Sequence, residues 1–191
     1  KTIKMTSSIK SIMNENVLDK TVLVRADLNI PMSNGNILDQ SRVERAIPTI
    51  NFLKSSGAKI VICSHLGRPN GKYNKNYTLK PLVEILSNIL ETNVRFSNSC
   101  LGQEALEIKT SLKAGEILLL ENVRFHEEET NNSLSFAKKL SEGCDLFVND
   151  AFSCSHRAHS SLHAITNFLP SYSGKLMDEE IKALKLSLIH I

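Results

Sequence analysis

Five short apolar runs, rich in valine, isoleucine and leucine, alternate along the chain with longer amphipathic segments. Such runs are typical of strands that are buried on both faces of a sheet. They lie at TVLVRADL (21–28), AKIVIC (58–63), NVRF (93–96), EILLLE (116–121) and DLFVN (145–149). We therefore expect a strand at each of these five positions.

The segments between the runs carry apolar residues at helical spacing. The clearest is 79–90, whose apolar side chains fall on one face at 3.6 residues per turn, with Thr78 as the expected N-cap. Another helix is expected over 43–53, where Pro48 must remove one backbone hydrogen bond and bend the helix. Similar patterns predict helices at 101–112, 134–140 and 177–188.

Strands and helices that alternate in this way predict an α/β fold. We expect a Rossmann-like, doubly wound parallel sheet with helices on both faces, in three α/β/α layers. Turn-forming residues SNGN (33–36) predict a small hairpin after the first strand. In such sheets ligands bind at the carboxyl ends of the strands, so that edge is where chemistry is expected.

Composition excludes several classes of partner. The formal net charge is only +3 and aromatic residues make up 5% of the chain, which does not suit a nucleic-acid groove with stacking platforms. No apolar run approaches the length of a membrane span, and residues 1–13 lack the apolar region of a secretory signal. These observations predict no nucleic-acid or membrane partner. The four cysteines are not closely paired in the sequence, so we expect a reducing, cytoplasmic location.

Arginine is scarce, with seven residues against sixteen lysines, and its positions are informative. Four arginines follow a predicted strand or begin the next helix, namely Arg42, Arg68, Arg124 and Arg157, and three histidines, His65, His156 and His159, share their loops. Because carboxyl ends of parallel strands meet at one edge, we expect these side chains to converge. Guanidinium groups bind phosphate and carboxylate through two parallel hydrogen bonds, so the pattern favours an anion site.

The stretch DAFSCSHRAHSS (150–161) is compatible with three kinds of chemistry. It could offer a metal site, a nucleophilic set of Ser or Cys with His156 and Asp150, or an anion pocket around Arg157. His156, His159 and Cys154 have no further ligand at zinc spacing, so no metal site is expected. There is no Gly-x-Ser-x-Gly elbow, although this does not exclude a nucleophile, and the cationic surroundings would serve an anion at least as well.

Two other motifs are weaker signals. GRPNGK (67–72) has one residue too few for a phosphate-binding loop, and no G-x-G-x-x-G follows any predicted strand. The sequence therefore gives no cofactor-binding residues. The run Glu127, Glu128 and Glu129 is expected to be a solvated face rather than a set of catalytic carboxylates.

Five motifs, in order along the chain, closely resemble the phosphoglycerate kinase family. They are VRADLNIP (24–31), SRVERAIPTI (41–50), SHLGRP (64–69), LLENVRFHEEE (119–129) and NDAFSCSHRAHSS (149–161). LPSYSGKLMDEEIKAL (169–184) resembles the family's passage from its amino-terminal domain into the interdomain helix. The resemblance implies a glycolytic phosphotransferase with a carboxyl group as acceptor, which converts 1,3-bisphosphoglycerate and ADP into 3-phosphoglycerate and ATP. It also implies a monomeric full-length enzyme that uses magnesium with ATP or ADP.

The same resemblance implies roles for individual residues. Asp27 and Asn29 would hydrogen-bond the glycerate end of the substrate, and Arg42 would face the phosphoryl group in flight as the catalytic residue. The basic patch around the substrate would comprise His65, Arg68, Arg124, His156, Arg157 and His159, with Arg25 beside it. If the histidines bind the anion as imidazolium, affinity should rise as pH falls through about 6.5.

The sequence departs from the family in one large respect, because it contains nothing like the family's second, nucleotide-binding domain. We expect residues 1–175 to form the substrate-binding domain of a two-domain kinase and 176–191 to begin the connecting helix. Such a chain would bind 3-phosphoglycerate or 1,3-bisphosphoglycerate but be inactive without the carboxy-terminal domain. The alternative is a stand-alone anion-binding or regulatory α/β module; an NAD enzyme is disfavoured by the missing glycine fingerprint.

Overall fold

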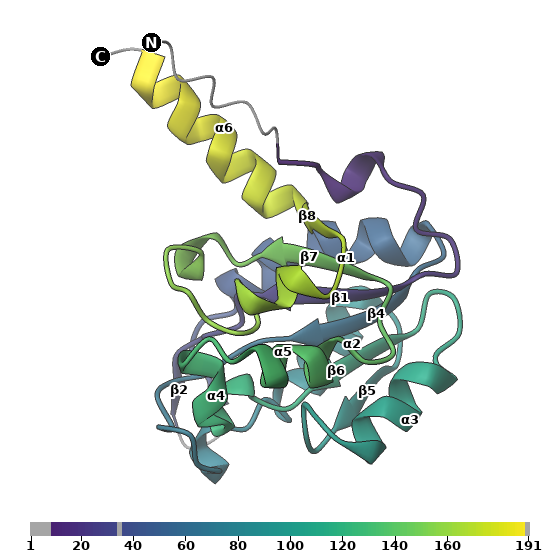
Figure 1. The fold of residues 1–191 in the computed structure, drawn as a ribbon, viewed down its shortest axis with the longest axis vertical. Helices are drawn as coiled ribbons and strands as arrows, with labels where there is room; N and C mark the ends of the chain where they lie inside the picture. The colour runs from purple at the N-terminus through teal and green to yellow at the C-terminus, as the bar shows by residue number, and fades with distance from the viewer. Residues whose placement is uncertain (1–8, 34–35, 190–191) are drawn as a thin grey trace.

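The structure is a computed structural model and describes residues 9–33 and 36–189. Its centre is a six-stranded sheet in the order β5-β6-β4-β1-β7-β8, in which every neighbouring pair is parallel (Figure 1). The strands are β1 (Thr21–Ala26), β4 (Lys59–Cys63), β5 (Val94–Ser97), β6 (Ile117–Leu120), β7 (Leu146–Asp150) and β8 (Ser171–Ser173). All five strands predicted from the apolar runs are confirmed.

Five of the six α-helices in the described residues lie where the amphipathic segments predicted them, with some differences at their ends, and α4 was not predicted. They are α1 (Ser41–Ser55), α2 (Leu82–Leu90), α3 (Gln103–Ser111), α4 (Glu127–Thr130), α5 (Leu134–Ser141) and α6 (Lys175–Ile189). Short 3-10 helices are η1 (Ile12–Asn14), η2 (Lys75–Tyr77), η3 (Val123–Phe125), η4 (Phe152–Cys154) and η5 (Ala164–Asn167). None of the helices in the described part of the chain has the length and apolar composition that crossing a membrane requires.

Alternate residues of the central strands bury against opposite helical layers. In β1, Val22 and Val24 pack in one apolar cluster with residues of α1 and α2. Leu23, which points to the opposite face, packs in a second cluster with residues of α3, α5 and η5. The three-layer α/β/α arrangement predicted from the sequence is therefore confirmed, and the apolar runs lack polar alternation because both faces are covered.

Helix α2 begins three residues later than predicted. It starts at Leu82, directly after Pro81, because the residue before a proline is disfavoured in the helical conformation. Thr78 does not cap this helix. Its hydroxyl instead donates a hydrogen bond to Glu121 Oε2 at 2.5 Å, which joins the segment before α2 to the end of β6.

Strand β8 was not predicted. Its sequence, Ser-Tyr-Ser, has no apolar run, and it forms a strand because its backbone continues the sheet beside β7. Helix α1 runs without interruption through Pro48, and the predicted hairpin is present as the antiparallel pair β2 (Met32–Ser33) and β3 (Asn36–Ile37). Residues 1–8 of the predicted domain, the hairpin turn 34–35, and residues 190–191 of the predicted connecting segment 176–191 lie outside the described residues.

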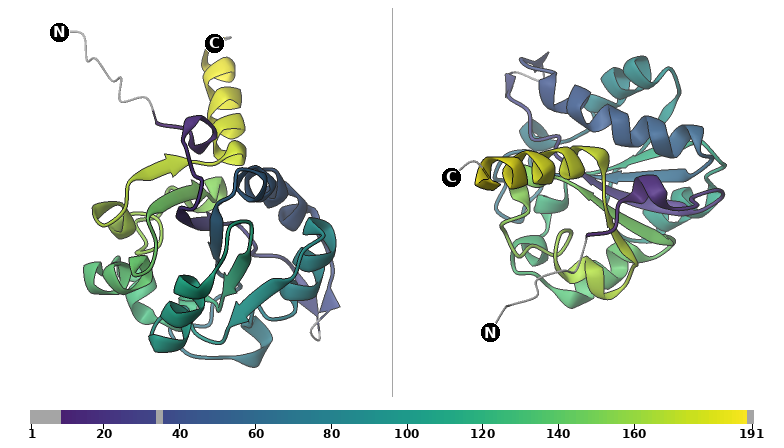
Figure 2. Two further views of the ribbon diagram at one scale, coloured as in Figure 1. Left: turned by 90° about the vertical axis from the view of Figure 1, so that its right-hand side faces the viewer. Right: turned by 90° about the horizontal axis from the view of Figure 1, so that it is seen from above.

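Helix α6 packs at its start against α1 and then extends away from the sheet (Figures 1 and 2). Its first free backbone amides are bonded by side chains from other elements, since Lys175 N donates to Thr49 Oγ1 at 2.9 Å and Met177 N to Asp150 Oδ1 at 3.2 Å. Asp178 accepts hydrogen bonds from Ser11 Oγ at 2.5 Å and from the Ser173 hydroxyl. The base of α6 is thereby fixed to β7, β8 and α1.

Candidate functional site

The predicted convergence of arginines occurs at the carboxyl ends of β6, β4, β1 and β7, which are neighbours in the sheet. Arg68 follows β4, Arg124 lies in η3 after β6, and Arg157 follows β7. Two cavities of about 430 Å³ and 280 Å³ open here, and all three arginines line both. The guanidinium groups therefore form a wall that the two cavities share.

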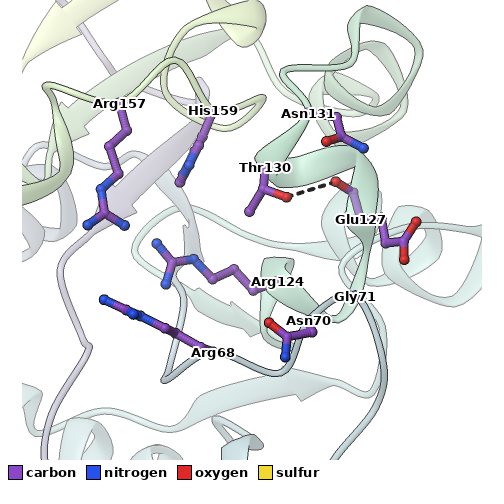
Figure 3. Close-up of a pocket in the computed structure, with 9 residues that line it drawn as sticks. All are labelled: Arg68, Asn70, Gly71, Arg124, Glu127, Thr130, Asn131, Arg157 and His159. Carbon is purple, nitrogen blue, oxygen red and sulfur yellow. Dashed lines mark hydrogen bonds between the residues drawn. The ribbon is translucent and has the colours of Figure 1, made fainter.

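The larger cavity has a cationic end and a neutral or acidic end (Figure 3). The three arginines and His159 gather on one side, and the remaining lining residues are Asn70, Gly71, Glu127, Thr130 and Asn131. Thr130 is held by its hydroxyl, which donates to the carbonyl of Glu127 at 3.1 Å. Apart from the arginines and His159, none of these lining residues was predicted from the sequence as part of a site.

The smaller cavity contains most of the other predicted site residues. Its lining adds Asn29, Arg42, His65, Gly67, Ser153 and Cys154 to the shared arginines. Asn29 accepts a hydrogen bond from Gly67 N at 2.9 Å, which joins the loop after β1 to the loop after β4. Gly67 has a φ of +62°, and a Cβ there would lie 2.3 Å from Tyr77 Cε1, so the turn that presents Arg68 requires glycine.

Arg124 is positioned by the backbone around it and is not neutralised by an acid. It is 7% exposed, and its Nη1 donates to the carbonyl of Gly67 at 2.9 Å. Among the described residues there is no hydrogen-bond partner for its Nε, nor for Nδ1 of His159 in the same cavity wall. Burial, followed by the charge of Arg25, lowers the pKa of Arg124. Buried nitrogens without partners at a cavity surface are the groups that a bound ligand would satisfy.

The shared arginines also lack ion pairs. Within the described residues the salt bridges are Arg42 with Asp27, at 2.7 Å, and Arg45 with Glu180. Arg68, Arg124 and Arg157 thus face the cavities with no carboxylate partner. An uncompensated cluster of guanidinium groups attracts anions, most strongly those with several oxygens such as phosphate.

Asp27 belongs to a small polar cluster with two residues that line the smaller cavity. Its Oδ2 accepts hydrogen bonds from Arg42 Nη1 at 2.7 Å and from Ser153 Oγ at 2.5 Å. Asp27 therefore orients Arg42 and connects the loop after β1 to η4. Asp27 is not itself part of the lining of either cavity, although its two partners line the smaller one.

The three predicted histidines have different environments. His65 is 2% exposed, and burial, followed by the charge of Arg25, lowers its pKa to about 2. Burial, followed by the charge of Arg124, lowers the pKa of His159 to about 4. In the protein without a bound anion, these directions disfavour the imidazolium form of both residues. His156 is exposed, lines neither cavity, and accepts a hydrogen bond from Arg157 Nε at 3.3 Å.

The rival chemistries for residues 150–161 are not supported by the geometry. Asp150 is 1% exposed and accepts a hydrogen bond from Met177 N. Gly174 packs directly against it, since a Cβ on Gly174 would lie only 2.3 Å from Asp150 Oδ1. It contributes to the start of α6 rather than orienting His156, whose partner is Arg157. Among the described residues, no group of three or more His, Cys, Asp or Glu side chains is placed to hold a metal ion.

A sequence model of the phosphoglycerate kinase family matches residues 12–190. The chain belongs to the phosphoglycerate kinase family. Among curated relatives, the phosphoglycerate kinase of Borrelia garinii subsp. bavariensis is 48% identical over 178 residues, and that of Wolbachia pipientis subsp. Culex pipiens is 45% identical over 178 residues. Each alignment covers 93% of this chain and 45% of the relative.

Solved structures of phosphoglycerate kinases have the same fold. The enzyme from Pyrococcus horikoshii superposes with a TM-score of 0.85 at 37% identity, and the alignment covers 93% of this chain and 45% of that one. The enzyme from Coxiella burnetii gives a TM-score of 0.84 at 37% identity, with coverage of 93% and 44%. The chain thus spans less than half the length of the phosphoglycerate kinases it matches.

Two side-chain contacts, those of Glu129 and Ser153, were not predicted from the sequence. Glu129 was expected on a solvated face, but it is 0% exposed and accepts two hydrogen bonds from Ser161. The hydroxyl of Ser153 donates a hydrogen bond to Asp27 Oδ2 at 2.5 Å, and this contact was not predicted either. No local signal identifies either contact, because the partners are separated by 32 and 126 residues in the sequence.

Proposed function

We propose that this chain is the 3-phosphoglycerate-binding half of a phosphoglycerate kinase. The observation that carries the proposal is the wall of Arg68, Arg124 and Arg157, which has no acidic partner and serves two cavities at the carboxyl ends of the central strands. The family membership supports the choice of a phosphorylated acid over other anions. The ligand would be 3-phosphoglycerate or 1,3-bisphosphoglycerate.

In this proposal the residues divide the substrate between them. The phosphate of 3-phosphoglycerate would bind to the shared arginines and the buried donors beside them, and the glycerate end would lie toward Asn29 and Asp27. Arg42, held by Asp27 and still 43% exposed at its side chain, would face the group that is transferred. His159 would contribute an uncharged surface to the pocket, and His156 would act by supporting Arg157.

The reaction would transfer the phosphoryl group of the acyl phosphate to the β-phosphate of ADP, giving 3-phosphoglycerate and ATP. Phosphoryl transfer needs reactants in line and cations around the equatorial oxygens, rather than covalent help from the protein. Arg42 would supply one such cation. The sequence has no glycine-rich nucleotide-binding loop, so the magnesium nucleotide would be bound by another domain of the enzyme. We propose that residues 176–191 begin the connection to that domain.

The proposal predicts that the chain alone does not catalyse the reaction. In a coupled assay of 3-phosphoglycerate-dependent ATP consumption, the purified chain should give no turnover above background, because the proposal assigns nucleotide binding to another part of the enzyme. A full-length phosphoglycerate kinase from Borrelia garinii provides the positive control. Turnover by the chain alone, abolished by Arg42→Ala, would contradict the assignment of the chain as half of the enzyme.

A further inference from the structure

Arg25 lies behind the wall of the smaller cavity and contacts it only through other residues. It is 0% exposed and lines neither cavity. Its guanidinium makes three hydrogen bonds: Nη1 to the carbonyl of Ala26 at 2.6 Å, Nε to Ser161 Oγ at 2.8 Å, and Nη2 to His65 Nδ1 at 2.9 Å. A fully buried arginine is costly unless its surroundings are arranged for it, so its orientation should be closely constrained.

The negative charge of Glu129 is linked to Arg25 through the hydroxyl group of Ser161. Glu129, also 0% exposed, accepts from Ser161 N at 2.9 Å and from Ser161 Oγ at 2.5 Å. Because Ser161 gives its only hydroxyl hydrogen to the carboxylate, it must accept the hydrogen of Arg25 Nε. The donors therefore run in one direction, from Arg25 through Ser161 to Glu129, and this network anchors the guanidinium at Nε.

The contact with His65 determines which of its ring nitrogens carries the proton. Arginine has no acceptor, so the nitrogen facing it, Nδ1, must offer its lone pair. In the neutral ring the proton is then on Nε2, and His65 is one of the residues that line the smaller cavity. A second proton on this ring is disfavoured, because the pKa of His65 is lowered to about 2. Burial is the main cause, and the positive charge of Arg25 is the next largest.

We propose that Arg25 is a positioning residue that holds His65 as a neutral imidazole with its proton on Nε2, so that this ring presents a fixed hydrogen-bond donor to the bound anion. The identity of the anion rests on the proposed function, but the position of the proton does not. A donor of this kind can bind an ionised phosphate or carboxylate oxygen and cannot accept a hydrogen bond from a protonated one. Arg25 and Glu129 would thus influence which form of the ligand binds without touching it.

The first test needs no ligand and no destabilising variant. Long-range proton–nitrogen correlation spectra of the uniformly ¹⁵N-labelled chain report the protonation of both ring nitrogens, and a His65→Gln sample assigns the His65 signals. We expect Nδ1 of His65 without a proton, Nε2 with one, and no change between pH 5 and pH 8. A proton on Nδ1, or a ring that titrates in this range, would overturn the proposal.

Variants then separate positioning from simple structural support. Arg25→Lys keeps a positive charge but lacks the fork that bonds Ser161 and His65 together, so we expect a mixture of His65 tautomers and a loss of 3-phosphoglycerate affinity of about tenfold, the effect of one hydrogen bond to a charged acceptor. Ser161→Ala, which removes only the anchor of Nε, should shift the spectrum in the same direction. Arg95→Lys, on the edge strand β5, is the matched control and should leave spectrum and affinity unchanged.

The outcomes also separate this proposal from the proposed function. If folded Arg25→Lys and Ser161→Ala keep the wild-type His65 spectrum, Arg25 has only a structural role and the proposal fails. If either variant does not fold, the wild-type spectrum still decides. If the wild type shows the expected tautomer but does not bind 3-phosphoglycerate, the proposed function fails while the tautomer assignment stands.

Discussion

Single residues at this site are best distinguished by whether they contact the anion or hold another group in place. Arg157 belongs to the first kind, because it lines both cavities and has no acidic partner. Arg157→Ala should weaken 3-phosphoglycerate binding by about ten- to a hundredfold, since a charge-assisted contact contributes about 1.5–3 kcal/mol. Calorimetric titration measures this, with Arg95→Ala as a control remote from the site; an unchanged dissociation constant would remove Arg157 from the site.

His65 should also influence stability as pH is lowered. Its pKa of about 2 in the folded protein lies below the unfolded value near 6.5, so the unfolded chain takes up the proton first as pH falls. The stability that neutral His65 contributes is complete above pH 6.5 and is lost progressively below it, by at most about 1.4 kcal/mol per pH unit.

The control for this pH effect is the His65→Gln variant, which cannot take up that proton. Urea unfolding at pH 7, 6 and 5 should show that the variant loses less stability than the wild type over this interval, whatever its stability at pH 7. Parallel losses in the two proteins would show that His65 does not resist protonation. The comparison of slopes cancels the contributions of His159 and of the carboxylates, which both proteins share.

At the scale of residues, the sequence predicted the gathering of the arginines, but not that His156 and Asp27 would line neither cavity. Arg68, Arg124 and Arg157 could be predicted because each follows a strand whose direction is set by the parallel sheet. The neutral state of His65 could not, because it depends on burial and on contact with Arg25. Glu129 was misassigned for the same reason. A glutamate in an acidic run is normally exposed, and here the hydrogen bonds donated by the distant Ser161 stabilise the buried carboxylate.

Among the elements, α6 depends most on contacts that are distant in sequence. Asp178 accepts from Ser11 and Ser173 and so ties the beginning of the helix to the amino-terminal segment and to β8. Asp178→Ala should lower the free energy of unfolding by about 1–3 kcal/mol, because it leaves partly buried hydroxyl donors without their acceptor.

The neighbouring exposed Glu179 offers a matched control for that variant. Glu179→Ala removes the same charge from the same turn and should change stability by no more than about 0.5 kcal/mol. Urea unfolding of the two variants and the wild type makes the comparison. Equal effects would show that α6 is stabilised by general helix electrostatics and not by the contacts of Asp178.

The elements that were predicted correctly are those whose signal is local. The five apolar strands and the amphipathic faces of α1, α2, α3 and α5 follow from spacing alone. Strand β8 could not be found in this way, because Ser171–Ser173 has no apolar run and becomes a strand only through pairing with β7. The start of α2 was misplaced because Pro81 overrode the apolar periodicity that continues back to Leu79.

Across the whole molecule, the sheet brings cations together from loops that are far apart in the chain. Among the described residues, Arg68, Arg124 and Arg157 form no salt bridge, so the protein keeps at one edge a charged surface that a bound anion would stabilise. An anion that binds only the folded state raises stability by mass action. The account therefore expects 3-phosphoglycerate to act as a stabilising ligand of this chain.

The most direct test of the central claim is isothermal titration of the chain with 3-phosphoglycerate at low salt, with the magnesium complex of ATP as the paired titration. The account predicts binding of the acid, weakened by Arg157→Ala and by added salt, and no binding of the nucleotide. Folded protein that binds the nucleotide and not 3-phosphoglycerate, or that binds neither, would contradict the assignment of this chain as the acid-binding half of the enzyme.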